Sequence, residues 1–179
     1  MIKTIITTTI LILLVGCASN RSGSTEASSL ADQPEWYTEL PSEDGWYYAT
    51  GYAKKQNPGL RRKTAVARAR DEVANSVEVT VNTMLKDFMQ ESGIGDRAEA
   101  LEFTKSVSEQ VASQVLQGSI IVKQQPGKDN TYYALVKYSV AQAAEATLQA
   151  VKREEALFNE FKAEQGFDDL ENAIRNNLK

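Results

Sequence analysis

The chain has 179 residues and a formal charge of −4, from 20 Lys and Arg against 24 Asp and Glu, with one cysteine and no histidine. Without histidine it has no Ser-His-Asp triad, no Cys-His pair and no imidazole zinc site, and one cysteine allows neither a CxxC motif nor an internal disulfide. The acidic balance argues against nucleic acid as a partner. Apolar residues make up 42% and charged residues 25% of the chain, the balance of a globular protein long enough to bury one core.

The N-terminus has the layout of a bacterial signal peptide over residues 1–16. Lys3 supplies a positive charge, and Thr4 to Val15 form an uncharged stretch rich in Ile and Leu. This apolar run is shorter than the roughly 20 residues of a membrane-spanning helix, so a cleaved signal peptide is favoured over a transmembrane anchor.

The only cysteine directly follows this apolar run, in a motif that resembles the lipobox of bacterial lipoproteins. The motif consists of Leu14, Val15, Gly16 and Cys17. The resemblance implies that the Cys17 thiol is lipidated, with palmitate among its acyl chains, and that the chain is cut before it. Ala18 and Ser19 do not resemble the Asp that retains lipoproteins in the inner membrane, which implies a lipid anchor in the outer membrane with the domain in the periplasm. An ordinary secretory signal that ends near a cysteine is the alternative.

Residues 17–33 are predicted to carry the lipid and to form a flexible tether. Residues 18–33 contain five serines and no aromatic residue, and a flexible coil of this length spans roughly 20–25 Å. Without residues 1–16 the chain has 19 basic and 24 acidic side chains, a charge of −5. We therefore expect acyl chains, rather than attraction to anionic lipid, to hold it at the membrane.

The folded part is predicted to begin near Pro34 with an extended segment, bounded by Pro41, that packs on the domain edge. The aromatic run from Trp46 to Ala53 predicts a first strand. Trp46, Tyr48, Thr50 and Tyr52 share one face of this strand, whereas Ala49, Gly51 and Ala53 on the other face offer no bulk. Gly51 is therefore interpreted as a packing glycine that lets a helix backbone approach, because a phosphate-binding loop would need further glycines before a helix.

Two helices are predicted after this strand. Apolar residues recur every three or four positions from Leu60 to Gln90, which indicates a long amphipathic helix, with a strand over residues 77–81 as the alternative. Its basic N-terminal part is followed by acidic residues, so partly neutralised solvated surface is favoured over a phosphate-binding stripe. Gly93 is a predicted C-terminal cap and Asp96 an N-cap for a second helix to about Leu116. The apolar stripe of that helix comprises Leu101, Thr104, Val107, Val111 and Val115.

Residues 119–125 and 131–139 predict a hairpin whose two faces both carry apolar side chains. One face is expected to take the long helix. The other, bearing Ile121, Tyr133 and Leu135 or the residues opposite them, is expected to be covered by a helix over residues 140–165 or by another subunit. We therefore expect the domain without its lipid to self-associate, and truncation after Gln149 to weaken this.

The predicted fold class is α+β, with long helices packed on a small three-stranded sheet and a C-terminal helical extension. The domain covers residues 34–150 and the extension residues 151–179. Gly166 is expected to break the 140–165 helix before a short amphipathic helix. The aromatic and aliphatic residues of the extension are Phe158, Phe161, Phe167, Leu170, Ile174 and Leu178.

Several motifs behind the lipobox are together similar to the LPP20 family of bacterial outer-membrane lipoproteins. They are Pro34-x-Trp36, the stretch from Tyr47 to Ala53, Ala65 with Ala69-Arg70 and Val73-Ala74, and the stretch from Tyr132 to Val136. The resemblance covers residues 34 to 145 and implies a compact domain in which a long helix lies on a small sheet, with no known active site. The family includes the flagellar assembly lipoprotein P, which implies a structural or assembly role in the cell envelope.

We expect no enzyme activity, no metal and no cofactor. The adjacent acidic pairs are Glu43-Asp44, Asp71-Glu72, Glu154-Glu155 and Asp168-Asp169. Neighbouring positions on a helix do not face each other, so these pairs are interpreted as solvated charge rather than carboxylate dyads or calcium ligands. No GxSxG or SxxK motif places a nucleophile at a defined turn.

The candidate binding or interface residues are Trp36, Trp46, Tyr48, Tyr52, Tyr133 and Leu135. The first hypothesis is an outer-membrane-anchored lipoprotein with a structural or assembly role, including a flagellar one, that acts by self-association or by docking an envelope protein. The second is a periplasmic binding module for peptidoglycan or a small apolar ligand, held by the aromatic residues at positions 36, 46, 48 and 52. Ordinary core and edge packing is the alternative for these aromatic residues.

Overall fold

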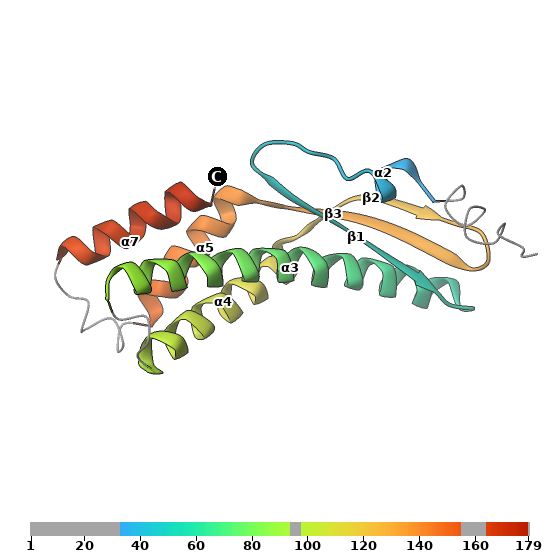
Figure 1. The fold of residues 1–179 in the computed structure, drawn as a ribbon. Coiled ribbons are helices and arrows are strands. Elements are labelled where there is room, and N and C mark those ends of the chain that lie inside the picture. The colour runs from blue at the N-terminus through green and yellow to red at the C-terminus, as the bar shows by residue number, and fades with distance from the viewer. Residues whose placement is uncertain (1–32, 94–97, 155–163, 179) are drawn as a thin grey trace, which may run out of the picture. The chain divides into compact units, whose positions relative to one another are not determined.

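The computed structural model describes residues 33–93, 98–154 and 164–178 (Figure 1). The chain divides into two units, Met1–Ala31 and Asp32–Lys179, and the second contains all the described helices and strands. The predicted signal peptide, the lipobox and the predicted tether as far as residue 32 lie outside the described residues.

Three antiparallel strands form one sheet in the order β1-β3-β2. They are β1 (Trp46–Lys54), β2 (Ile120–Pro126) and β3 (Thr131–Ser139). The turn between β2 and β3 places Asp129 and Asn130 at positive φ (52° and 59°), a conformation that these short polar residues tolerate. The predicted hairpin and the α+β class are both confirmed.

Helix α3 (Pro58–Glu91) is the longest element of the described chain. Its N-terminus is capped, because the Asn57 side chain accepts a hydrogen bond from the Leu60 amide (2.9 Å) and Pro58 occupies the first helical position. Its 34 residues run about 51 Å. The helix is continuous through residues 77–81, so the alternative of a strand there is wrong.

The N-terminal half of α3 lies directly on the sheet at Gly51. A Cβ atom at this position would collide with the backbone of Ala65 and Ala69. Ala49 and Ala53 share this face of β1 and are buried, and they pair with Val136 and Tyr132 of β3. The interpretation of Gly51 as a packing glycine is therefore confirmed.

The remaining helices extend the core beyond the sheet. They are α4 (Ala98–Gly118), α5 (Val140–Arg153) and α7 (Glu164–Asn177). Helix α4 packs on α3, α5 packs on α4, and α7 contacts both α3 and α5 (Figure 1). In the described residues no helix is both long enough and apolar enough to cross a bilayer.

Two details of these helices differ from the prediction. Leu101 is 50% exposed, and Phe103 is buried instead, because α4 is held between α3 and α5 and turns a broad face inward. Gly166 lies inside α7 rather than at a break. Asp96, Phe158 and Phe161 lie outside the described residues, as does the Phe167 side chain.

The segment before β1 forms a one-turn helix, α2 (Glu35–Thr38), and not the predicted extended segment. The turn closes through hydrogen bonds from the Tyr37 amide to the Pro34 carbonyl (2.8 Å) and from the Glu39 amide to the Glu35 carbonyl (2.7 Å). Pro34 precedes the helix with an extended backbone, so its ring does not obstruct the turn. In Figure 1, α2 and α3 lie on opposite sides of the sheet.

The predicted cover for the second face of the hairpin is also wrong. Tyr133 is 7% exposed and Leu135 is 0% exposed within the single chain, and the Tyr133 ring contacts Tyr37 of α2, an element that the prediction did not place on this face. Ile121 does not share this face, because it pairs with Val136 and turns toward α3. Because Tyr133 and Leu135 are already buried within the chain, they give no structural support for self-association.

Candidate docking surface

The face of the sheet opposite α3 carries most of the aromatic side chains that the sequence singles out. In the β1–β3 register, Trp46 lies opposite Ser139, Tyr48 opposite Lys137, Thr50 opposite Leu135, and Tyr52 opposite Tyr133. Side chains of directly paired residues lie on the same side of a sheet. We call the surface formed by Trp46, Tyr48, Tyr52, Tyr133, Leu135 and Lys137 the aromatic face.

One end of the aromatic face is charged. The Lys137 Nζ lies 3.7 Å from the centre of the Trp46 ring and 3.9 Å from Glu43 Oε2. The Tyr48 hydroxyl donates a hydrogen bond to the same Glu43 oxygen (2.6 Å), and this bond to a carboxylate raises the pKa of Tyr48 above its ordinary value. A cation, an anion and two aromatic rings thus meet at a half-buried position that solvent still reaches.

The other end is a cluster of three tyrosine rings. The Tyr37 ring of α2 lies edge-on to Tyr133 (4.9 Å between centroids) and to Tyr52 (6.2 Å). Burial, with the neighbouring tyrosines adding a smaller effect, raises the pKa of Tyr37. Arg68 of α3 reaches the edge of this cluster, donating a hydrogen bond from Nη1 to the Tyr52 carbonyl (2.9 Å). The cluster fixes α2 on the sheet while Tyr52 itself stays 49% exposed.

Strand β2 adds an exposed apolar edge beside this face. Ile120, Ile121 and Val122 are all exposed, and Ile120 is 49% exposed. The β2–β3 register is interrupted between Ile121 and Lys123, a bulge that discourages pairing with another strand. Side-chain contact is therefore a better use of this edge than strand addition.

The six predicted residues have different positions in this arrangement. Trp46, Tyr48, Tyr52, Tyr133 and Leu135 come together on the aromatic face, and of these Tyr133 and Leu135 are buried. Trp36 is half-buried on α2, where its neighbour Tyr37 makes the ring contacts to the sheet. Cys17 and the other lipobox residues lie outside the described residues.

Sequence reasoning missed three participants: Tyr37, Glu43 and Lys137. The sequence shows Tyr37 beside Trp36, but an expected extended segment gives no reason to turn one of the two toward the sheet. Lys137 alternates with apolar residues in β3, and this is the signal that identifies it, because period two places it on the face of Leu135. Glu43 lies in a turn, where no periodicity applies.

The chemistry offered by the aromatic face is that of contact and recognition. Aromatic rings with a partly solvated cation and carboxylate supply large contact area with polar anchoring, the pattern enriched at protein interfaces. Across residues 33–93, 98–154 and 164–178 no three His, Cys, Asp or Glu side chains gather as a metal-binding group.

The family model described as LPP20 lipoprotein matches residues 34–139. The matched stretch holds α2, the whole sheet, α3 and α4, and it ends at the last residue of β3. No curated protein and no solved structure matches the chain.

Proposed function

We propose that this chain, which belongs to the LPP20 lipoprotein family, is anchored in the outer membrane. We further propose that it has a structural or assembly role in the cell envelope. In this role it docks a protein partner, a second copy or another envelope protein, through the aromatic face. The observation that carries the docking surface is the half-exposed group of Trp46, Tyr48 and Lys137.

The sequence supports the membrane placement. Family membership makes the chain an envelope lipoprotein held by lipid, and Cys17 is the only thiol available to carry that lipid. The residues after Cys17 lack the inner-membrane Asp signal, which favours the outer membrane. Replacing Cys17 by serine is expected to abolish incorporation of a labelled fatty acid, and label on the C17S protein would contradict the assignment.

The aromatic face supports docking because its exposed part is not needed to fill the core. Tyr133 and Leu135 are buried by the chain itself, whereas Tyr52 and Ile120 stay about half exposed on the same side of the sheet. Aromatic residues at such positions dominate the binding energy of protein interfaces. The aromatic face therefore offers a protein partner apolar side chains for contact and, beside them, the charged pair of Lys137 and Glu43.

A cross-linking comparison tests this proposal. In whole cells, a lysine-reactive or photoactivated cross-linker is expected to join the wild-type chain to a discrete partner, and Trp46→Ala is expected to remove that adduct. Val79→Ala is the control, because Val79 is an exposed apolar residue of α3 on the other side of the sheet. Equal loss with both variants, or no loss with Trp46→Ala, would contradict docking at the aromatic face.

The alternative function, binding of peptidoglycan or a small apolar ligand, uses the same aromatic residues. One face of the Trp46 ring is already covered by Lys137, which leaves less ring for a sugar to stack on. Retention of the mature protein on purified cell wall, with loss of retention in Trp46→Ala, would replace docking by this alternative.

The proposal includes no catalytic step. The chain has no histidine, and its motifs place no nucleophile beside a base.

A role in flagellar assembly, implied by the family resemblance, is tested by swimming in soft agar after deletion of the gene. Normal motility with a weakened envelope would restrict the role to the envelope.

A further inference from the structure

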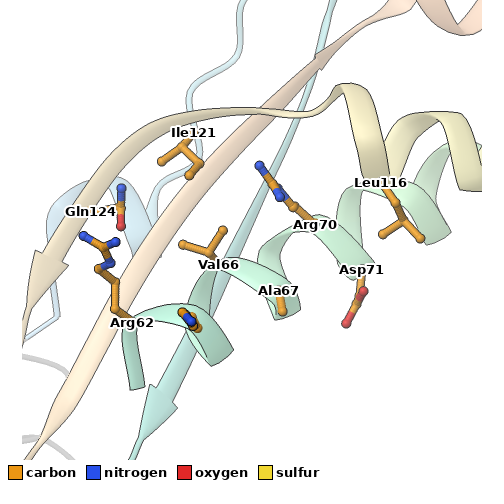
Figure 2. Close-up of a pocket in the computed structure, with 9 residues that line it drawn as sticks. Arg62, Val66, Ala67, Arg70, Asp71, Leu116, Ile121 and Gln124 are labelled. Carbon is orange, nitrogen blue, oxygen red and sulfur yellow. The ribbon is translucent and has the colours of Figure 1, made fainter. Parts of the chain in front are cut away.

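On the opposite side of the sheet from the aromatic face, α3 and the edge strand β2 enclose a pocket of about 400 Å³ (Figure 2). The lining residues are Arg62, Lys63, Val66, Ala67, Arg70, Asp71, Leu116, Ile121 and Gln124. Its volume lies in the range of small-molecule sites. The pocket is open to solvent at the exposed edge of β2.

Three of the lining side chains are cations without a partner. Within the described residues, Arg62, Lys63 and Arg70 form no ion pair and no hydrogen bond. Within the described part of the chain, the acidic residues that follow this basic stretch in the sequence form no ion pair with these three side chains, although the Asp71 carboxylate lies in the same pocket. In a chain with a net charge of −4, the pocket concentrates three positive charges against the single carboxylate of Asp71.

Arg70 is the most unusual of the three. Its Nε atom is buried and lacks a hydrogen-bond partner within the described residues. Figure 2 shows Arg70 extending from α3 toward β2, beside Ile121, while the Asp71 side chain leaves α3 in a different direction. A buried N–H of a charged group without an acceptor costs free energy, which a bound anion would recover.

The rest of the wall is apolar. Val66 of α3, Leu116 of α4 and Ile121 of β2 line the pocket, and Leu116 and Ile121 are exposed at 38% each. An inorganic anion would meet the cations but leave these side chains in water. A ligand with an apolar chain beside its anionic group would cover both.

We propose that this pocket binds an anionic amphiphile, with an oxyanion head such as phosphate at Arg62, Lys63 and Arg70. The apolar chain of the ligand lies against Val66, Leu116 and Ile121. A second copy of the chain is a poor occupant at this edge, since a symmetric contact would bring two sets of unpaired cations together. The source of the head group is either a soluble amphiphile or a phospholipid of the membrane to which the lipoprotein is anchored.

This inference goes beyond the proposed docking function and does not rest on it, because the pocket and the aromatic face lie on opposite sides of the sheet. Trp46→Ala is therefore expected to leave ligand binding unchanged. A pocket variant is expected to lose ligand binding and to keep normal cross-linking, whereas Trp46→Ala is expected to lose cross-linking and to keep ligand binding. Each proposal can therefore fail without the other.

The test uses the mature lipoprotein reconstituted by its own anchor into phosphatidylcholine vesicles, with protein-free vesicles as the blank. Equilibrium dialysis of labelled hexyl phosphate is expected to show saturable binding, at least about tenfold tighter than inorganic phosphate, because the chain adds buried apolar area. Hexanol is expected not to compete, because it lacks the head group.

Arg70→Gln is expected to weaken hexyl phosphate binding about tenfold or more, the effect of losing a charge-assisted contact. Arg62→Gln, at an exposed position, provides a second variant if Arg70→Gln impairs folding. Lys86→Gln removes a charge from an exposed position of the same helix outside the pocket and is expected to bind as the wild type does. Non-saturable binding, full competition by hexanol, or equal loss in Lys86→Gln would overturn the proposal.

Vesicles that also contain phosphatidylglycerol distinguish the two sources of the ligand. If a membrane phospholipid occupies the pocket, these vesicles reduce hexyl phosphate binding by the wild type, and if the ligand is soluble they do not. Either outcome presupposes the saturable, Arg70-dependent site, and absence of that site contradicts both.

Discussion

At the scale of single residues, Gly51 determines how closely α3 approaches the sheet. Gly51→Ala is expected to lower the free energy of unfolding by about 3 kcal/mol, the upper part of the range for overpacking, because the new Cβ would collide with rigid backbone at Ala65 and Ala69. Gly59→Ala is the matched control, since a Cβ there meets only Asn57 Oδ1 at 3.4 Å and alanine favours a helix. Urea unfolding of both variants measures the difference. Equal effects would contradict the close contact.

Buried tyrosines make stability depend on alkaline pH. Burial raises the pKa of Tyr138 above the ordinary tyrosine value of 10.0, so the protonated ring is favoured in the folded state. The resulting stability is fully present below about pH 10 and is lost as the pH rises through the higher folded-state pKa. The free energy of unfolding is therefore expected to fall more steeply above pH 10 in the wild type than in Tyr138→Phe. Identical slopes for the two proteins would show that Tyr138 titrates as it does in the unfolded chain.

At the scale of elements, Asn57 sets the start of α3. Asn57→Ala removes the hydrogen bond to the Leu60 amide and is expected to cost about 1 kcal/mol in unfolding free energy. Asn75→Ala makes the same change at an exposed interior position of α3, where alanine is the better helix former, and is expected to be neutral or slightly stabilising. A smaller cost for Asn57→Ala than for Asn75→Ala would show that the cap does not hold the helix.

The elements with strong periodicity could be predicted from the sequence, and those set by tertiary contact could not. The strands and α3 carry patterns of period two and of three to four, and the small residues around Gly51 identified the face toward α3. The one-turn helix α2 carries no such pattern, because its conformation depends on Tyr37 reaching Tyr133. Likewise Phe103 is buried only because α4 has neighbours on two sides, which a single stripe does not predict.

The candidate surface was partly predictable for the same reason. Alternation in β1 and β3 places Trp46, Tyr48 and Tyr52 on one face, whereas the pairing with Lys137 depends on the strand register. The pocket was not predicted, because the acidic residues close to Arg62 and Arg70 in the sequence suggested a partly neutralised surface. Figure 2 shows that the Asp71 and Arg70 side chains leave α3 in different directions.

At the scale of the whole molecule, α7 shares the core with α3 and α5. Leu170, Ile174 and Leu178 are buried, although the family match ends at residue 139. Ile174→Ala is expected to lower the free energy of unfolding by about 3 kcal/mol through loss of buried area and a residual cavity. Asn172→Ala, at an exposed position of α7, is expected to have little effect. A single cooperative urea transition in each variant is expected, and a separate early transition for Ile174→Ala would mean that α7 unfolds independently.

Site-specific photo-cross-linking tests most directly whether the aromatic face contacts a protein partner in the cell envelope, on which the proposed function depends. A photoreactive amino acid at position 48, on the aromatic face, is compared in whole cells with one at position 72, an exposed position of α3. Docking at this face predicts a discrete protein adduct from position 48, identified by mass spectrometry and lost with Trp46→Ala, and none from position 72. The same adducts from both positions, or an adduct at position 48 that persists with Trp46→Ala, would contradict it.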